Sequence, residues 1–328
     1  MSDRKLRWGL LSTARINRSL IPPLRMSPRN DLVAVASRTQ EKADSYAREW
    51  NIPVAYGSYE AMLASPDIDV VYVPLPNSMH EHWTIEAAKA GKHVLCEKPL
   101  AISVGEVDAI RVVAERAGVV VTEAFMYRHH PQTLKVKELV DAGVIGQVRL
   151  VRGSFSFNLT REGDVRLDPL LGGGSLWDVG CYPVSYARYI VGQEPVEVFG
   201  RKVVGRTGVD ETFTGTLRFP GNVYAQIDCS FRATFRTHVE IVGSEGAISV
   251  LHPFKPGKEE HIIIARGDES ERIAVQGPEL YLGEVEDMAD AVLLGKPPRI
   301  SLADSRANIA ALVALLESAE SGQPVRMA

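Results

Sequence analysis

Three side chains have groups and spacings suited to chemistry on a hydroxyl group: a lysine, an aspartate and a tyrosine. Lys98 ends the apolar run HVLCEKP (93–99), and ligands of open α/β sheets bind outside the carboxyl ends of the strands. Lys98 is therefore expected to face a ligand crevice, with its backbone held extended by Pro99. Asp178 and Tyr182 are four residues apart, which predicts that they share one face of a helix.

Each of these residues also has a purely structural interpretation. Lys98 could be a surface lysine at a strand end, and Tyr182 could be a core tyrosine with a satisfied hydroxyl. Asp178 could close a capping box with Ser175, the expected N-cap residue, although Glu or Gln is preferred there. Pro183 is expected to break the helix ladder beside Tyr182, which we interpret as a stability cost of fixing that position.

The first 125 residues alternate nearly continuous apolar runs with helix-patterned segments, which predicts a parallel sheet with right-handed crossovers. The apolar runs are 6–12, 32–38, 70–76, 93–99 and 119–125. The helical segments are 39–50, 78–91 and 103–118.

After about residue 147 the pattern changes to short alternating segments joined by Gly, Pro and Asn, which indicates a mostly antiparallel sheet. Helices are expected over 175–192 and 302–322. The predicted fold is α/β: a Rossmann-type doubly wound parallel sheet, followed by an α+β domain with a large, mostly antiparallel open sheet. We expect a dinucleotide-binding domain over 1–123 and a substrate and oligomerisation domain over 124–328. The closing helix is expected to pack back on the first domain.

The loop after the first strand lacks the glycines of the G-x-G-x-x-G fingerprint, because Ser12, Ala14 and Asn17 occupy their places. Ser and Ala are small enough for close backbone approach, and Ser12 and Thr13 add hydroxyls at a helix N-terminus. Asn17 is bulky for its place and suggests a wider helix–strand spacing. Pro22 and Pro23 are expected to interrupt this helix early. The loop alone leaves a dinucleotide site and a plain strand–helix turn both open.

The end of the second run favours the dinucleotide site and indicates which dinucleotide it takes. NAD-binding chains usually place Asp or Glu there for the ribose 2′-hydroxyl, whereas this chain has Ser37 and Arg38. An arginine beside a small hydroxyl suits a 2′-phosphate. We therefore expect NADP(H) to be preferred, with NAD(H) possible; the alternative is that Arg38 only caps a strand at the surface.

Composition excludes several other classes of function. The 37 basic and 41 acidic residues give a net charge of −4, which offers no argument for nucleic acid or an anionic membrane. No apolar run approaches the length of a membrane helix, and the N-terminus has no room for a signal peptide. Three widely spaced cysteines form neither a disulfide framework nor a metal pair, which predicts a cytoplasmic protein.

Two histidine pairs, His80 with His82 and His129 with His130, raise the question of a metal. The first pair is two residues apart on a predicted helix, so its side chains point in different directions. Adjacent histidines on an extended segment also diverge. We expect no metal site.

Several longer motifs together resemble the Gfo/Idh/MocA family of oxidoreductases. They are WGLLSTARIN, PLPNSMH, CEKPLA, EAFMYRHHP, GGGSLWDVGCYP and IVGSEGAI, followed by the closing helix. Tyr182, where many members carry His, and the AFMYR stretch resemble the branch of dimeric dihydrodiol dehydrogenase, D-xylose dehydrogenase and glucose-fructose oxidoreductase. The loop without glycines departs from the commoner family pattern.

The resemblance implies hydride transfer between NADP(H) and a sugar or related cyclic alcohol or ketone. Tyr182 would be the acid/base, Lys98 would lower its pKa from about 10, and Asp178 would bind a substrate hydroxyl. Glu97 would orient Lys98 or the nicotinamide ribose. The implied cofactor residues are Ser12, Thr13, Ala14, Arg15, Ile16, Ser37, Arg38, Pro74, Leu75, Pro76, Asn77, His80, Glu97 and Lys98. Tyr127, Arg128 and Phe157 would border the substrate together with Asp178 and Tyr182.

Other readings of the same fold stay open. Some relatives are glycosidases that use a bound dinucleotide with no net redox, and a ketosugar reductase of a biosynthetic pathway or a sensor without turnover is also compatible. The alternating strands after residue 195 predict a homodimer or homotetramer formed through the open face of the second sheet. Pentose, hexose, nucleotide-linked ketosugar and trans-dihydrodiol all remain candidate substrates.

Overall fold

The computed structural model describes residues 4–327, and its contacts divide the chain into two compact units. The first unit runs to Met126 and also contains Tyr281–Arg306. The second unit consists of Tyr127–Leu280 and the residues from Ala307 onward. Residues 281–306, which the sequence pattern assigned to the second domain, thus belong to the first unit.

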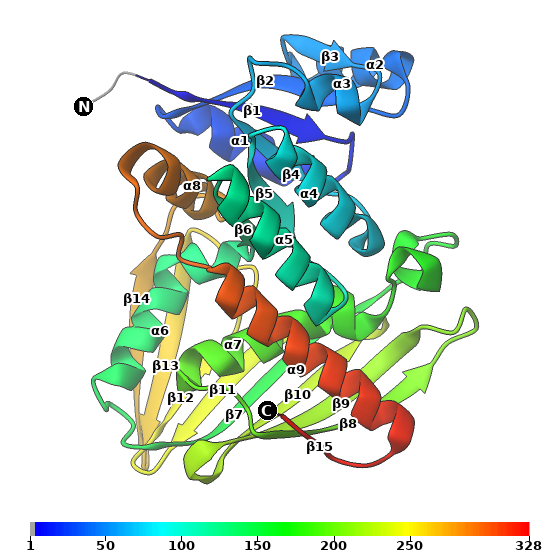
Figure 1. Cartoon of the computed structure of the whole chain (residues 1–328). Coiled ribbons are helices and arrows are strands. Elements are labelled where there is room, and N and C mark those ends of the chain that lie inside the picture. Colours follow the sequence, from blue (N-terminus) through cyan, green and yellow to red (C-terminus); the bar gives the residue numbers. More distant parts are fainter. Residues whose placement is uncertain (1–3, 328) are drawn as a thin grey trace. The chain divides into compact units, whose positions relative to one another are not determined.

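The first unit is built on a six-stranded parallel sheet in the order β3-β2-β1-β4-β5-β6 (Figure 1). Its strands are β1 (Leu6–Leu11), β2 (Asn30–Ala36), β3 (Val54–Tyr56), β4 (Val70–Val73), β5 (His93–Glu97) and β6 (Val121–Ala124). All five predicted runs are strands, and β3 is an addition. Each run extends beyond its strand by one to three residues into the following loop, and these include the predicted site residues Ser12, Ser37, Arg38 and Lys98.

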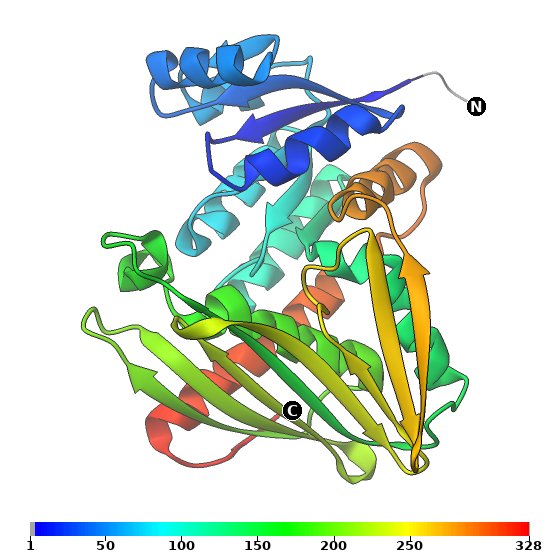
Figure 2. The same cartoon turned by 180° about the vertical axis from the view of Figure 1, so that it is seen from behind.

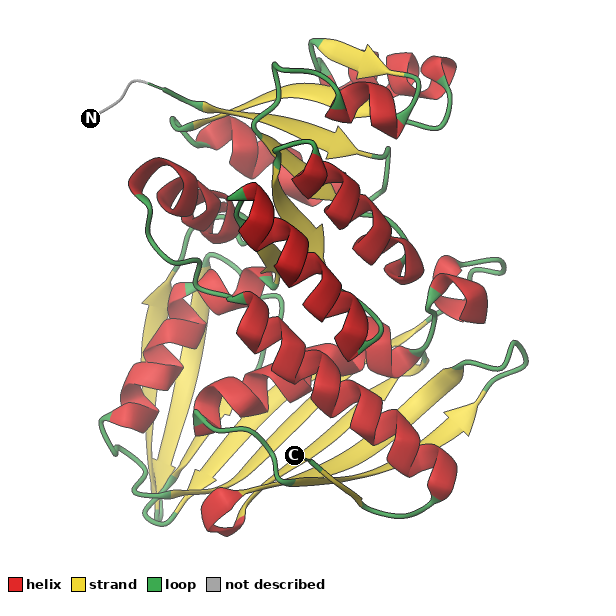
Figure 3. Ribbon diagram, in the orientation of Figure 1, coloured by secondary structure: helices red, strands yellow, loops and turns green. Residues whose placement is uncertain are grey.

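Helices separate these strands and cover the sheet (Figure 3). They are α1 (Asn17–Met26), α2 (Gln40–Trp50), α3 (Tyr59–Leu63), α4 (His80–Lys89), α5 (Val104–Ala117) and α8 (Leu282–Leu294). The expectation that Pro22 and Pro23 would interrupt α1 is wrong, because both lie inside the helix. Leu20, Ile21 and Leu24 of this helix are fully buried, and their burial offsets the lost backbone hydrogen bonds.

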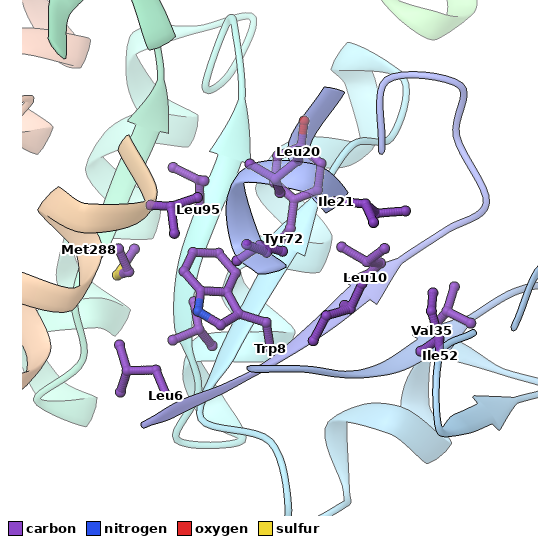
Figure 4. Close-up of a cluster of buried hydrophobic side chains, with 14 of the residues drawn as sticks. Leu6, Trp8, Leu10, Leu20, Ile21, Val35, Ile52, Tyr72, Leu95 and Met288 are labelled. Carbon is purple, nitrogen blue, oxygen red and sulfur yellow. The ribbon is translucent and has the colours of Figure 1, made fainter. Parts of the chain in front are cut away.

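A cluster of buried side chains joins the sheet to α1 and α8 (Figure 4). Trp8 lies at its centre, and its indole N–H donates to Asn30 Oδ1 at 2.6 Å. Val285, Met288 and Ala289 of α8 belong to the same cluster. This shared core explains why a helix from late in the chain is part of the first unit.

The second unit contains a nine-stranded sheet in the order β14-β13-β12-β11-β7-β10-β9-β8-β15. The strands are β7 (Val148–Asn158), β8 (Glu197–Val204), β9 (Asp210–Phe219), β10 (Val223–Ser230), β11 (Arg232–Gly243), β12 (Ala247–Val250), β13 (Glu259–Arg266), β14 (Glu269–Gln276) and β15 (Val325–Arg326). Every neighbouring pair is antiparallel except β7 and β10, which run parallel. The predicted fold class is confirmed for both sheets.

Helices lie on one face of this sheet, and the other face is bare (Figures 1 and 2). The covering helices are α6 (Pro131–Asp141), α7 (Cys181–Val191) and the part of α9 (Leu302–Ser321) that belongs to this unit. Short helical turns are found at η1 (Asn77–Met79), η2 (Met126–His129), η3 (Val165–Leu167), η4 (Pro169–Leu171) and η6 (Pro220–Asn222). The helices fix which face of the sheet can carry a buried site.

The segment that carries Asp178 and Tyr182 begins with one π-helical turn, η5 (Leu176–Gly180), and continues directly as α7. Pro183, which is predicted to break the helix ladder beside Tyr182, lies in the first turn of α7 directly after the π turn. Because proline has no N–H, one backbone hydrogen bond of the ladder is missing there. A π turn widens the helix by one residue and is often found at functional sites.

Ser175 occupies the N-cap position that the sequence predicts, but its side chain makes no capping hydrogen bond. Its backbone is already helical, and its hydroxyl donates to Asp210 Oδ2 at 2.6 Å. The same Asp210 oxygen accepts the backbone N–H of Leu176 at 2.8 Å. The cap is thus supplied by β9, a connection that local sequence cannot reveal.

Within residues 4–327, no helix has the length and apolar character needed to cross a membrane.

Candidate active site

The loop after β1 forms a tight turn without a fingerprint glycine. Ser12 stands in the first glycine place with φ of 146°, a backbone region that glycine favours. Its Oγ accepts the N–H of Ala14 at 3.1 Å, and its carbonyl accepts the Asn17 side-chain amide at 2.8 Å. Asn17, which looked too bulky, is fully buried and closes the turn.

This loop meets the loop after β4, where the strand order of the sheet reverses. Ser12 Oγ lies 3.5 Å from the carbonyl of Pro74, and β1 pairs directly with β4. Ligands of doubly wound sheets bind at this switch point. The structure thus brings the predicted residues 12–16 beside the predicted residues 74–77.

The N-terminus of α1 is open to an anion. Its N-cap residue, Ile16, makes no side-chain cap, and its first turn carries no acidic residue. In contrast, α2, α3 and α5 are capped by the hydroxyls of Thr39, Ser58 and Ser103. The first N–H groups of a helix need a partner, and a phosphate is a suitable one. These residues therefore fit the pyrophosphate of a dinucleotide.

Ser37 and Arg38 follow β2 as expected. Ser37 is buried, and its N–H donates to the Tyr56 carbonyl at 3.0 Å, whereas Arg38 is exposed. Thr39 accepts the N–H of Lys42 and begins α2. Ser37 and Arg38 lie between β2 and Thr39. Neither is the acidic residue that usually binds the ribose 2′-hydroxyl of NAD.

His80 connects the loop after β4 with the segment after β5. Its ring is fully buried, with Nε2 2.8 Å from the Leu75 carbonyl and Nδ1 2.7 Å from the Pro99 carbonyl. Burial lowers the pKa of His80 to about 4, so the ring is neutral at pH 7 and donates to only one of them. The loop after β4 is thereby tied to the segment after Lys98.

Glu97 ends β5 and forms hydrogen bonds beside Lys98. One of its carboxylate oxygens accepts the Tyr72 hydroxyl, and the other accepts the Lys98 backbone N–H at 3.3 Å. Burial and the charge of Glu97 raise the pKa of Tyr72 well above its ordinary value, so Tyr72 stays a donor. Lys98 thus leaves the strand at a point fixed by its neighbour.

A second carboxyl, Glu284 of α8, lies near Glu97 and was not found by sequence reasoning. It is 1% exposed, and neither of its oxygens has a hydrogen-bond partner. Burial, with the charge of Glu97 as the second cause, raises the pKa of Glu284 well above its ordinary value. Glu97 is half-buried, and the hydrogen bonds that it accepts favour its charged form. Two neighbouring carboxyls resist joint ionisation. Glu284 therefore carries the proton.

In the second unit, the helix with Asp178 and Tyr182 lies very close to the sheet. A Cβ on Gly153 of β7 would come within 2.7 Å of the Pro183 side chain. A Cβ on Gly180 would come within 2.8 Å of both Cys229 Sγ and the Leu176 side chain. Glycine at these two positions lets the helix approach and sets the height of Tyr182 above the strands.

Tyr182 is 4% exposed, and its ring is enclosed by aromatic neighbours. The centroid of its ring is 5.3 Å from that of Phe155, 5.5 Å from Phe254 and 5.8 Å from Tyr127. Edge-to-face and tilted arrangements of this kind stabilise ring orientation. Phe155 of β7 contacts Tyr182. Phe157, two residues later on the same strand, packs on Phe231 with ring centroids 5.3 Å apart, and its predicted place beside the substrate stays a prediction.

Tyr127 and Arg128 are both buried and converge on α7. The Tyr127 hydroxyl donates to Ser185 Oγ at 2.9 Å, and Arg128 Nη1 lies 3.4 Å from the same oxygen. The Arg128 guanidinium also stacks on the Tyr189 ring, 4.0 Å from its centroid. These contacts place Tyr127 and Arg128 beside the helix that carries Tyr182.

Asp178 pairs with an arginine that the sequence did not point to. Arg166 Nε donates to Asp178 Oδ2 at 2.7 Å. The two residues are twelve positions apart and are separated by a loop of no regular period, so no spacing rule links them. The reciprocal capping box with Ser175 is not formed, because the Ser175 side chain makes no capping hydrogen bond.

The structure thus assembles two groups of predicted residues. The first unit collects residues 12–16, 74–77 and 97–98 at the carboxyl edge of its sheet, with Arg38 at the end of β2. The second unit collects Tyr127, Arg128, Asp178 and Tyr182. The predicted assistance of Tyr182 by Lys98 joins the two units and stays a prediction. Among residues 4–327 no cluster of His, Cys, Asp and Glu could hold a metal ion.

Comparison with known proteins agrees with both halves of this arrangement. Residues 6–125 match the model of an oxidoreductase family with an NAD-binding Rossmann fold, and residues 133–249 match the GFO/IDH/MocA C-terminal domain. The chain is 38% identical over 325 residues to D-xylose 1-dehydrogenase (NADP(+)) 2 of Haloferax volcanii, covering 98% of this chain and 99% of that protein. The chain belongs to the Gfo/Idh/MocA family.

Two solved structures extend this result. Aldose-aldose oxidoreductase from Caulobacter crescentus, in complex with glycerol, superimposes with a TM-score of 0.92 at 27% identity, covering 99% of this chain and all of that one. A 3-ketoreductase from Actinomadura kijaniata, in complex with NADP and TDP-benzene, gives 0.92 at 30% identity, covering 96% and 98%. Trans-1,2-dihydrobenzene-1,2-diol dehydrogenase of Bos taurus is 35% identical over 254 residues, covering 76% of this chain and 75% of that protein. This Gfo/Idh/MocA protein is an enzyme of the NAD(P)-dependent sugar oxidoreductase type.

Replacing Glu284 by Gln should stabilise the enzyme in a pH-dependent way. Because the pKa of Glu284 is raised in the folded state, its favourable contribution is complete below the ordinary value of 4.5. That contribution is lost as the pH rises toward the folded value. Gln does not ionise in either state, so the variant should match the wild type near pH 4.5 and have a higher free energy of unfolding at pH 8, with a difference that grows as the pH rises.

Denaturant unfolding at several pH values measures this difference. Glu41→Gln, on the exposed side of α2, is the matched control and should give no such trend. A Glu284→Gln difference that stays constant from pH 4.5 to 8 would show that Glu284 is ionised in the folded protein.

Proposed function

We propose that this enzyme oxidises a sugar, or reduces the corresponding carbonyl, with NADP(H) as the hydride partner. The observation that carries the proposal is the placement of Asp178 and Tyr182 one turn apart on a helix held tightly against the sheet. Similarity over nearly the whole chain to a D-xylose 1-dehydrogenase supports a sugar as substrate.

In this proposal Tyr182 takes the hydroxyl proton as the hydride leaves carbon, and returns it in the reverse direction. Lys98 supplies the positive charge that favours the tyrosinate. Asp178 accepts a hydrogen bond from a substrate hydroxyl. The aromatic neighbours of Tyr182 keep its ring direction fixed and exclude water from its flanks.

The dinucleotide would be held by residues of the first unit, and it would supply or accept the hydride. The open N-terminus of α1 and the loop Ser12–Ile16 would bind the pyrophosphate. The loop Pro74–Asn77, supported by His80, would lie along the cofactor, and Glu97 would orient Lys98 or the nicotinamide ribose. Ser37 and Arg38 would bind the 2′-phosphate, which favours NADP(H) over NAD(H).

A ketosugar reductase is the second candidate. A similar solved structure is a 3-ketoreductase described with NADP and TDP-benzene, and a dTDP-3,4-didehydro-2,6-dideoxy-alpha-D-glucose 3-reductase is 32% identical over 299 residues. A nucleotide-linked ketosugar as the only turned-over substrate would favour this candidate. The cytoplasmic location expected from the cysteine content stays a prediction.

We also propose a homodimer or homotetramer formed through the bare face of the nine-stranded sheet. The side chains on this face are polar or half-exposed, and Arg152 pairs with Glu240 across neighbouring strands at 3.2 Å. Tyr224 of β10 is 40% exposed among them. The face also carries half-exposed apolar residues, Leu150 and Val242, in register with Tyr224. A broad, regular face of this mixed character suits the association of two identical sheets.

Replacing Tyr182 by Phe should lower kcat for D-xylose with NADP+ by a hundredfold or more, because the proton acceptor is lost. Lys98→Ala should have a similar effect. The assay is the rise in absorbance at 340 nm, with NAD+ run in parallel. Tyr189→Phe, on the same helix, is the control that removes a hydroxyl without touching the reacting position. Near-normal turnover by Tyr182→Phe would show that the assigned role is wrong.

Replacing Arg38 by Ala should weaken NADPH binding by about tenfold or more and leave NADH binding nearly unchanged, because only NADPH carries the 2′-phosphate. Fluorescence titration of both cofactors gives the dissociation constants. Lys42→Ala removes a nearby exposed charge and should change neither value. Tighter binding of NADH than of NADPH by the wild type would contradict the assignment of Arg38.

Light scattering at micromolar concentration should show a dimer or tetramer. Tyr224→Arg should shift the population toward monomer, because it adds unpaired charge to the proposed contact face. Val112→Arg, which changes an exposed residue of α5 in the first unit, is the control and should leave the assembly intact. A wild-type protein that is only monomeric would refute the proposed interface.

A further inference from the structure

Arg166 belongs to a chain of alternating charges that ends at Asp178. Arg166 Nη1 lies 3.3 Å from Asp164 Oδ1 while its Nε binds Asp178. Asp164 is held in turn by Arg161, whose Nη2 lies 2.6 Å from Oδ2. The order is Arg161, Asp164, Arg166, Asp178, and the formal charges of the four sum to zero.

Asp164 is the fixed point of this chain. Its side chain is 3% exposed, and it accepts the backbone N–H of Arg166 at 3.0 Å as well as the two guanidinium groups. Burial opposes its ionisation, but these hydrogen bonds and charges lower the pKa of Asp164 below its ordinary value. The loop before the three glycines is thereby anchored by a buried carboxylate, and Arg166 projects from that anchor.

Asp178 needs such support, because a carboxyl group rotates easily about its last bond. A bond from a rigid guanidinium fork restricts that rotation more than water does. Arg166 is always charged, so Asp178 beside it is an acceptor. The Asp178 side chain is 13% exposed, which leaves it accessible to a ligand from one side.

We propose that Arg166 is the positioning residue for Asp178 and that it fixes the carboxylate as a hydrogen-bond acceptor for a hydroxyl of an uncharged polyol. This inference rests on the proposed function of Asp178 in substrate binding. The positive charge of Arg166 is balanced by two carboxylates, those of Asp164 and Asp178, so this part of the site favours a neutral ligand over an anionic one. The substrate class that fits is a neutral sugar rather than a sugar acid or sugar phosphate.

A double-mutant cycle with Asp178→Asn tests the inference. Arg166→Ala should raise KM for D-xylose about tenfold or more, the usual range for disturbing a hydrogen bond to a charged group, with a smaller change in kcat and an unchanged Kd for NADPH. In the Asp178→Asn background the same substitution should have almost no further effect. Arg166→Lys, which keeps the charge without the fork, should lie between wild type and Arg166→Ala.

Arg161→Ala is the matched control, because Arg161 binds Asp164 but does not contact Asp178, and its side chain is 65% exposed. It should leave KM near the wild-type value. A full KM effect of Arg166→Ala in the Asp178→Asn background would overturn the proposal and indicate that Arg166 contacts the substrate directly. A wild-type preference for a sugar acid or sugar phosphate would overturn the neutral-substrate part.

Crystal structures of the wild type and Arg166→Ala provide a readout that needs no turnover. The Asp178 carboxylate should have one direction in the wild type and several, or a different one, in the variant. An unchanged, well-ordered Asp178 in the variant would overturn the positioning role, even if no tested substrate were turned over. Absence of turnover with all sugars, together with a displaced Asp178 in the variant, would refute the proposed function and leave the positioning role supported.

Discussion

The close approach of the Asp178–Tyr182 helix to its sheet is the constraint on which the second unit depends. It is possible only because Gly153 and Gly180 lack a Cβ where Pro183, Cys229 and Leu176 come close. A helix at ordinary distance would lift Tyr182 away from Phe155. Asp210 of β9 fixes the N-terminal end of the same helical segment by accepting hydrogen bonds from Ser175 and Leu176. Packing against the sheet and capping by a strand together leave Tyr182 little freedom of position.

In the first unit the corresponding constraint acts on Lys98, whose backbone is held in place where β5 ends. Glu97 does this by accepting the Lys98 N–H and the Tyr72 hydroxyl. A charged carboxylate in this place requires that its neighbour Glu284 stay neutral. Neither oxygen of the buried Glu284 has a hydrogen-bond partner, and burying such a group lowers the stability of the fold. We interpret this cost as the consequence of keeping a neutral carboxyl beside the charged Glu97. Such costs are common at functional sites.

The strands and helices were readable from the sequence because their signals are local. Continuous apolar runs predicted the buried parallel strands, and alternation predicted the open sheet. Asp178 and Tyr182 were readable because a spacing of four residues survives in a helix. Asp210, Arg166, Glu284 and Phe155 were not found, because each acts on a residue far away in sequence or on another element. Pro22 and Pro23 were misjudged because burial of the helix face outweighs the local preference of proline.

The loop without glycines shows how tertiary contacts can replace a sequence signature. A non-glycine residue at φ of 146° costs of order 1–3 kcal/mol, and the fingerprint avoids that cost by using glycine. Here the Asn17 amide binds the Ser12 carbonyl, and the Ser12 hydroxyl accepts the Ala14 N–H. These two bonds hold the strained turn, so the residue that seemed to obstruct the loop is the one that closes it. The N-terminus of α1 stays open to an anion even though all three fingerprint glycines are absent.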